Sequence, residues 1–236
     1  MVTRIGIIGD VHAEHERLAR ALSFLEQEGV DTVICTGDLA DGTGCLDSCV
    51  ALLKQHDVLT VRGNHDRWVL ENKARHIPNA HFLEHLSDPT IAYLEDLPQE
   101  RHLTTRHGEL KLCHGVGSND LQKIWPGTER MPAERSKRLD EIIDEGRFHL
   151  MVNGHVHYRT LIHFQNMTLL NAGTLRGDHR PGFALIDLET EQVHGFELEP
   201  DIHEVKIQSI KPNGGTRVFK NTQHFDDNWE PVTLYA

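Results

Sequence analysis

Apolar residues in the first half of the chain fall into short continuous runs separated by stretches with helical spacing. Three of the runs have the length of buried strands: 4–9, 32–36 and 58–62. Helices are predicted between them over 15–28, which Gly29 ends, and over 46–55. Strands separated by helices pair in parallel through right-handed crossovers. This half of the chain therefore predicts an α/β sheet.

The second half has a less regular pattern. Further helices are predicted over 67–75, around 91–97 and over 133–145, and further strands over 111–113 and 150–153. The stretch 115–132 predicts a long loop, which we interpret as a lid over a site. Short β segments then follow at 159–164, 168–171, 182–188, 192–198 and 204–210. They predict an antiparallel second sheet packed on the first.

Polar residues of a few types stand at or near the ends of these apolar runs. They form five motifs in order: Gly9-Asp10-Val11-His12, Gly37-Asp38, Gly63-Asn64-His65-Asp66, Cys113-His114-Gly115 and Gly154-His155-Val156-His157. Asp, Asn and Gly also favour turns, which would explain one such strand end. Asp10, Asp38 and Asn64, however, follow three successive strands, and ligands in open α/β sheets bind beyond such carboxyl ends. The motifs therefore predict one shared site.

The residue types in these motifs indicate metal chemistry. Seven side chains are candidate ligands: Asp10, His12, Asp38, Asn64, His114, His155 and His157. The two oxygens of a carboxylate such as Asp38 can bridge two divalent cations about 3.5–4 Å apart. We expect Mn. Fe, Zn, Co and Ni stay as alternatives, because mixed oxygen and nitrogen ligation alone does not select among these metals. Such a pair favours phosphate ester cleavage by a metal-bridging hydroxide.

Three neighbouring residues complete the predicted site. His65 is the candidate for protonating the departing alkoxide, with Asp66 or another carboxylate orienting its ring. A residue that only stabilises charge is the alternative role for His65. Arg67 is the first candidate for binding the substrate phosphate, because the metal ligands fix its neighbours. The alternatives are Arg176, Arg180, Arg130 and Arg135. Trp125, in the predicted loop, could stack on a base or an aromatic leaving group, although packing alone also explains it.

Composition limits the possible functions. The 236 residues, 38% of them hydrophobic, suffice for one sizeable core, and the formal net charge of −12 disfavours an extended nucleic-acid surface. We find no apolar stretch long enough to cross a membrane and no signal-peptide core, and we expect a cytoplasmic protein. The four cysteines lack zinc-ribbon spacing and are interpreted as reduced thiols. The sequence does not indicate an oligomeric state.

The motif series resembles that of the calcineurin-like metallophosphoesterase superfamily, over roughly residues 4–188. The resemblance implies an α/β fold, a four-layer α/β/β/α sandwich of two mixed sheets flanked by helices. We assign it to residues 1–200, with residues 201–236 as an extension of unknown role. The resemblance also implies that Asp10, His12, Asp38 and His157 hold one metal, that Asp38, Asn64, His114 and His155 hold the other, and that His65 is the general acid.

Departures from some branches of the family bear on the substrate. Ala13 follows His12 where protein phosphatases usually have Gly, and no Arg stands between Asp41 and Gly42. The stretches 93–98 and 171–174 look more like small bacterial phosphoesterases of broad specificity. We therefore expect a small phosphomonoester or phosphodiester as substrate. The alternatives are a nucleotide-directed hydrolase, acting on dinucleoside polyphosphates or cyclic nucleotides, and, with less support, a protein phosphatase or a non-catalytic scaffold.

Overall fold

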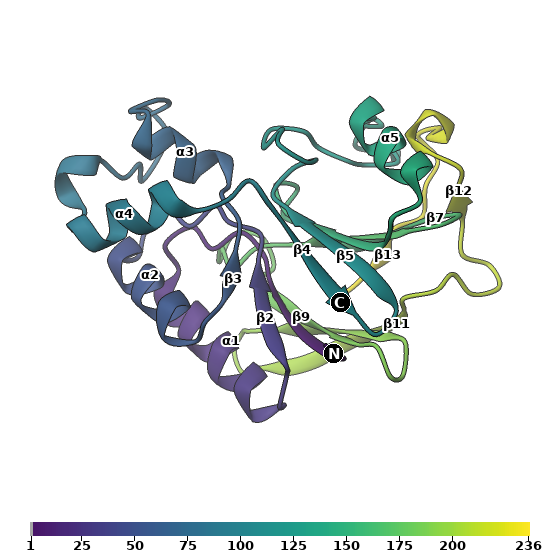
Figure 1. The fold of residues 1–236 in the computed structure, drawn as a ribbon, viewed down its shortest axis with the longest axis horizontal. Coiled ribbons are helices and arrows are strands. Elements are labelled where there is room, and N and C mark those ends of the chain that lie inside the picture. The colour runs from purple at the N-terminus through teal and green to yellow at the C-terminus, as the bar shows by residue number, and fades with distance from the viewer. Residues whose placement is uncertain (1) are drawn as a thin grey trace.

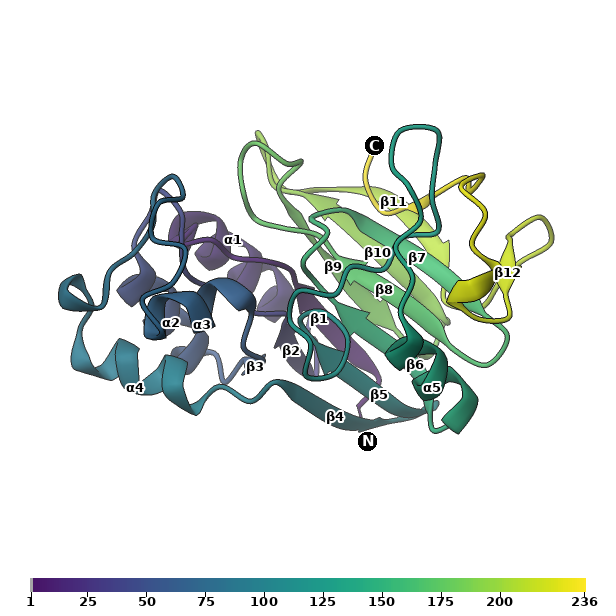
Figure 2. The same cartoon turned by 90° about the horizontal axis from the view of Figure 1, so that it is seen from above.

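Two β-sheets pack face to face between two outer layers (Figure 1). The computed structural model describes residues 2–236. Helices α1 to α4 cover one sheet, and α5 with the C-terminal segment covers the other, as the two views show (Figures 1 and 2). This arrangement confirms the expected four-layer α/β/β/α sandwich with two mixed sheets.

The first sheet has six strands in the order β11-β10-β9-β1-β2-β3. Their bounds are β1 Arg4–Ile8, β2 Thr32–Cys35, β3 Leu59–Thr60, β9 Gly182–Asp187, β10 Gln192–Glu197 and β11 His203–Ser209. As predicted, β1, β2 and β3 pair in parallel. Helices α1 (His15–Gln27) and α2 (Leu46–Gln55) connect them. The carboxyl ends of these three strands therefore lie at one edge of the sheet.

The second sheet has seven strands, six of them in the order β12-β7-β8-β6-β5-β4, with β13 paired to β7. Their bounds are β4 Glu100–Thr105, β5 Gly108–Cys113, β6 Phe148–Asn153, β7 Arg159–Phe164, β8 Thr168–Ala172, β12 Val218–Phe219 and β13 Val232–Thr233. Strands β5 and β6 are parallel, whereas β4 and β5 form an antiparallel hairpin. The sheet is therefore mixed.

The β segments after residue 159 were expected to form one antiparallel sheet, and this prediction is wrong. Strands β7 and β8 belong to the second sheet, whereas β9, β10 and β11 extend the first sheet antiparallel to β1. The chain crosses between the sheets after β8. Strand β4 was not predicted, because its polar sequence ERHLTT buries only alternate side chains at the edge of the sheet.

The remaining helices are α3 (Asn64–Leu70), α4 (Asp88–Asp96), α5 (Lys137–Glu145) and two short 3-10 turns, Leu83–His85 and Thr222–His224. Helix α3 was predicted three residues later, over 67–75. It begins earlier because the carboxylate of Asp66 accepts the backbone N–H of Gly63 and caps the helix start. Among residues 2–236, no helix combines the length and the hydropathy that a bilayer crossing requires.

Buried apolar side chains form three layers, one at each contact between the four structural layers. Leu18 and Leu22 of α1 pack with Phe183 between the helices and the first sheet. Ile5 and Leu112 belong to the layer between the sheets. The third layer lies between the second sheet, α5 and the C-terminal segment, and its members include Ile142, Phe148, Phe225 and Trp229. The segment after residue 200 thus contributes to both sheets and to the core.

Candidate metal centre

The predicted ligands meet where parallel strands of both sheets end. Asp10 and His12 follow β1, Asp38 follows β2, Asn64 follows β3, His114 follows β5, and His155 and His157 follow β6. Two contacts tie the edges of the sheets together. The backbone N–H of His155 donates to Oδ2 of Asp10 over 2.8 Å, and Nδ1 of His114 lies 2.8 Å from the carbonyl oxygen of Thr36. The topology therefore gathers residues far apart in sequence.

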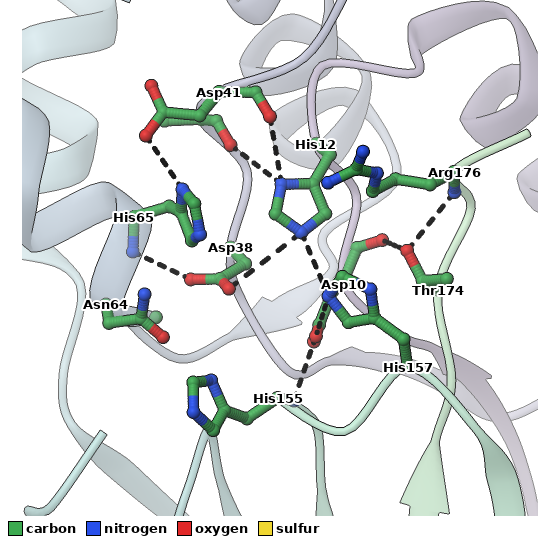
Figure 3. Close-up of polar contacts among 12 residues, drawn as sticks. Asp10, His12, Asp38, Asp41, Asn64, His65, His155, His157, Thr174 and Arg176 are labelled. Carbon is green, nitrogen blue, oxygen red and sulfur yellow. Dashed lines mark hydrogen bonds and ion pairs between the residues drawn. The ribbon is translucent and has the colours of Figure 1, made fainter. Parts of the chain in front are cut away.

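The ligand atoms fall into two groups that meet at Asp38. Asp10, His12 and His157 form one group, and Asp38, His114 and His155 form the other, with ligand atoms within 4.8 Å of one another in each. Oδ2 of Asp38 lies 3.2 Å from Nε2 of His114 and 4.0 Å from Nε2 of His12. One carboxylate oxygen therefore faces both groups, and Figure 3 shows its contact with His12.

In the first group, three ligand atoms converge. Nε2 of His157 lies 3.3 Å from Oδ2 of Asp10 and 3.2 Å from Nε2 of His12. Nδ1 of His12 lies 2.9 Å from the backbone carbonyl of Asp41, so it carries the proton of the neutral ring. The Nε2 lone pair of His12 consequently faces the centre, which is the arrangement that a metal-binding histidine needs.

The second group shows the same arrangement. Nδ1 of His114 donates to Thr36, so Nε2 is a lone-pair atom in the neutral ring. This Nε2 lies 3.2 Å from Oδ2 of Asp38 and 3.1 Å from Oδ1 of Asn64. Three electron-pair donors at these distances require a proton or a cation between them. The donor set, carboxylate, amide oxygen and imidazole, fits a divalent cation of the Mn, Fe or Zn type.

The ionisation of these side chains reflects buried, concentrated negative charge. Burial alone would lower the pKa of His114, but the carboxylates of Asp38 and Asp10 outweigh it and raise this pKa to about 10. Burial would raise the pKa of Asp38, yet His114 and the other histidines hold it far below its usual range. Burial lowers the pKa of His12 and of His155 to about 4. The carboxylates are thus ionised and call for compensating positive charge.

Four predicted ligands have left-handed backbone conformations that non-glycine residues rarely adopt. The φ angles are 46° at His12, 48° at Asp38, 69° at His155 and 60° at His157. Such conformations cost free energy and occur mainly where surrounding structure enforces them, often at functional sites. The loops after β1, β2 and β6 are therefore built for ligand placement rather than for the most relaxed turn.

Two glycines of the motifs leave room for the ligand carboxylates. A Cβ atom at Gly63 would collide with Oδ1 of Asp38, and one at Gly154 would collide with Oδ1 of Asp10. Because the backbone passes so close to these carboxylates, nearby backbone N–H groups can donate to them. His65 N–H donates to Asp38 over 2.8 Å, and His155 N–H donates to Asp10 over 2.8 Å. These glycines thus allow the backbone to hold both carboxylates.

His65 lies beside the ligands, with a carboxylate at its ring. Nδ1 of His65 lies 2.8 Å from Oδ2 of Asp41 (Figure 3). Arg75 donates one hydrogen bond to each oxygen of the same carboxylate, at 2.8 and 2.9 Å. The sequence predicted Asp66 or another carboxylate as the partner of the ring, and the structure has the second alternative, Asp41, and not Asp66. The capped start of α3 turns Asp66 away, and its carboxylate accepts backbone N–H groups from Leu39, Ala40 and Gly63.

Arg67, predicted to bind phosphate, is held by another carboxylate. Its guanidinium donates two hydrogen bonds to Asp120, at 2.7 and 2.8 Å, and a third to Glu71. The early start of α3 places its side chain towards the 115–132 loop. Lys123, in that loop, shares a cavity with His155 and His157 and forms no ion pair within residues 2–236. Sequence inspection missed Lys123, because a lone loop lysine carries no spacing signal.

Known proteins resemble this chain in part of its sequence and in its fold. Uncharacterized protein MJ0912 of Methanocaldococcus jannaschii is 33% identical over 66 residues, which span 28% of this chain and 27% of that protein. A metallophosphoesterase from Sphaerobacter thermophilus superposes with a TM-score of 0.60 at 20% identity, covering 88% of this chain and 90% of that one. Hypothetical protein PH1004 from Pyrococcus horikoshii gives 0.66 at 17% identity, covering 84% and 88%. These structures share the fold.

A family model covers most of the chain. The model of the calcineurin-like phosphoesterase superfamily domain matches residues 3–191. This range includes all five motifs and ends in the turn between β9 and β10. The chain belongs to the calcineurin-like phosphoesterase superfamily.

Proposed function

We propose that the protein is a phosphoesterase that uses two divalent cations to hydrolyse a small phosphomonoester or phosphodiester. Asp38 is the main support, because one of its oxygens faces ligand atoms of both groups. Asp10, His12 and His157 would hold one cation with Asp38. Asn64, His114 and His155 would hold the other with the same carboxylate. We propose Mn as the native metal, with Fe, Zn, Co and Ni as alternatives.

Bound cations would supply Lewis-acid polarisation of the phosphoryl oxygens and acidify water. The protein's own part is to hold these groups and to handle the leaving group. The Asp41 carboxylate fixes Nδ1 of His65, so that Nε2 is the ring atom available to the substrate. His65 is proposed to protonate the departing oxygen. Asp41 orients the ring and raises its pKa, and Arg75 holds Asp41 in place.

Metal content and turnover test this function together. Wild-type protein loaded with Mn²⁺ and dialysed should retain about two equivalents per chain and hydrolyse p-nitrophenyl phosphate. Asp38→Ala should lose both properties, because it removes the shared carboxylate. Asp144→Ala, which removes an exposed carboxylate on α5, is the matched control and should retain both. A folded wild-type protein with no specific uptake of any of these metals and no turnover would contradict the assignment.

A nucleotide-directed hydrolase is the second candidate, since aromatic side chains line a cavity beside His155 and His157. A product screen over dinucleoside polyphosphates and cyclic nucleotides separates it from a broad phosphatase.

The cytoplasmic location stays a prediction. All four cysteines are free thiols and three of them are buried, which agrees with the predicted reduced state.

A further inference from the structure

A cavity of about 370 Å³ opens beside the predicted ligands His155 and His157. Trp125, Met131 and Tyr158 are among its lining side chains, and Lys123 also lines it. The volume lies within the range of small-molecule sites, roughly 300–1,000 Å³. Its position next to the metal centre and its aromatic wall suit a ring attached to a phosphate.

The wall is fixed by packing rather than being a free lid. Trp125 is only 5% exposed, and its ring contacts that of Trp229 edge-on with the centroids 5.0 Å apart. The ring centroid of Tyr158 lies 5.7 Å from that of Trp125. Trp125 and Glu134 also exchange two backbone hydrogen bonds, at 2.8 and 3.2 Å. Residues 125–134 are therefore a preformed part of the cavity.

The C-terminal segment holds this loop in place. Trp229 N–H donates to the carbonyl of Gly127 over 2.9 Å, and a carboxylate oxygen of Asp227 accepts the N–H of Ala133 over 2.5 Å. The segment is itself anchored on α5, where Thr222 N–H donates to Asp140 over 2.7 Å. Thr222, Asp227 and Trp229 all lie after residue 191, where the family match ends. The residues that line the cavity lie within the matched domain, and a part of the chain outside that domain supports them.

The cavity and the proposed general acid lie at different parts of the metal centre. His65 contacts Asp41 and His12, and these two residues line a separate pocket. His155 and His157 line the cavity, whereas His65 does not. A leaving group protonated by His65 would depart outside the cavity. A ring in the cavity would therefore belong to the group that stays on phosphorus.

We propose, on the basis of the phosphoesterase function above, that this cavity binds an aromatic or heteroaromatic ring on the retained substituent of the substrate. The substrate class is then an aryl-bearing phosphodiester or phosphonate monoester. The segment 222–229 acts as a positioning element, because it holds the Trp125 wall without touching the phosphate.

Two esters that differ only in the retained group test the proposal. They are p-nitrophenyl phenylphosphonate and p-nitrophenyl methylphosphonate, which release the same p-nitrophenolate. For the Mn²⁺-loaded wild type we expect a KM about tenfold lower for the phenyl ester, with similar kcat values. Phenylphosphonate should also bind more tightly than methylphosphonate in calorimetric titrations. Equal KM values and equal affinities would overturn the proposal.

Variants locate the preference. Trp125→Ala should bring the ratio of the two KM values close to 1, and Tyr158→Ala, at a side chain 36% exposed and so of low risk to folding, should reduce it in the same direction. Asp227→Ala should also reduce the ratio, because it frees Ala133. The control is Asp144→Asn, which changes an exposed carboxylate on α5 away from the cavity and should leave the ratio unchanged. A phenyl preference that survived in both Trp125→Ala and Tyr158→Ala would overturn the proposal.

The two proposals fail in different ways. Hydrolysis of both esters without a phenyl preference retains the phosphoesterase function and rejects the cavity. Absence of hydrolysis of both esters and of p-nitrophenyl phosphate, in metal-loaded protein, rejects the function. The calorimetric titrations then decide about the cavity, since they need no turnover.

Discussion

Nδ1 of His65 lies 2.8 Å from Oδ2 of Asp41, and Arg75 donates two hydrogen bonds to the same carboxylate. Burial would raise the pKa of Asp41, but the hydrogen bonds from His65 and Arg75 outweigh it and lower this pKa. Asp41 is therefore ionised, and it fixes both the tautomer and the orientation of the His65 ring. The carboxylate that matters to His65 is three residues after Asp38, not next to His65.

Asp41→Asn should slow the cleavage of esters with poor leaving groups. We expect kcat to fall about 10- to 100-fold for alkyl and phenyl esters and far less for p-nitrophenyl esters, which need no proton. A series of aryl phosphates of graded leaving-group basicity measures this difference. Asp66→Asn is the control, because Asp66 supports backbone N–H groups instead. It should lower the melting temperature and leave the dependence on the leaving group unchanged.

Gly63→Ala should abolish metal binding. The added Cβ would occupy the space of Oδ1 of Asp38, and because the clash involves a buried carboxylate, that ligand has to move. We expect uptake of Mn²⁺ to fall below one equivalent, as measured by elemental analysis. Gly146→Ala is the control, since nothing lies within 4 Å of a Cβ added there, although its backbone is left-handed (φ 62°). It should cost about 1 kcal/mol of stability and keep normal metal content.

Lys123→Gln should weaken phosphate binding more than Arg67→Gln. The ammonium of Lys123 lines the cavity beside His155, whereas Asp120 holds the guanidinium of Arg67. We expect KM for p-nitrophenyl phosphate to rise about tenfold in Lys123→Gln, the loss of about 1.4 kcal/mol. Arg67→Gln should change KM less than about threefold. A larger effect at Arg67 would favour the sequence-based assignment over the structural one.

His163 should make the stability of the fold depend on pH. Its side chain is 2% exposed, and burial lowers its pKa from 6.5 to about 4. Between these values the unfolded chain binds the proton and the folded chain does not, so stability falls as the pH is lowered. We expect a loss of about 2 kcal/mol between about pH 7 and pH 5 from this residue. Urea unfolding of the wild type and of His163→Gln at both pH values measures this contribution. It is the part of the pH-dependent change in unfolding free energy that the variant lacks.

The elements that sequence patterns predicted well are those with a local cause. Strands β1 and β2 are continuous apolar runs bounded by Gly and Asp, and α2 was predicted with its observed bounds. The ligand set followed from strand ends, and Asp10 and Asp38 lie together because parallel strands end at one edge. These features depend on nearest neighbours in sequence and on one topological rule.

The features that were missed depend on distant parts of the chain. The sheet to which β9 belongs is decided by its pairing with β1, which no local pattern encodes. The link between His65 and Asp41 depends on the path of the loop after β2, where Asp41 itself has a φ of 66°. The role of Trp229 required knowing that the C-terminal segment returns to the 115–132 loop. Each needs a three-dimensional contact between segments.

The metal centre also forms a seam between the sheets, since Asp10 and Asp38 come from one sheet and His114 and His155 from the other. Elsewhere the sheets meet through apolar side chains such as Ile5 and Leu112, whose contacts are not directional. A small shift of one sheet relative to the other would change the distances between the ligands of the first sheet and those of the second. Substitutions in that apolar layer should therefore change the cation affinity even when they are too mild to unfold the protein.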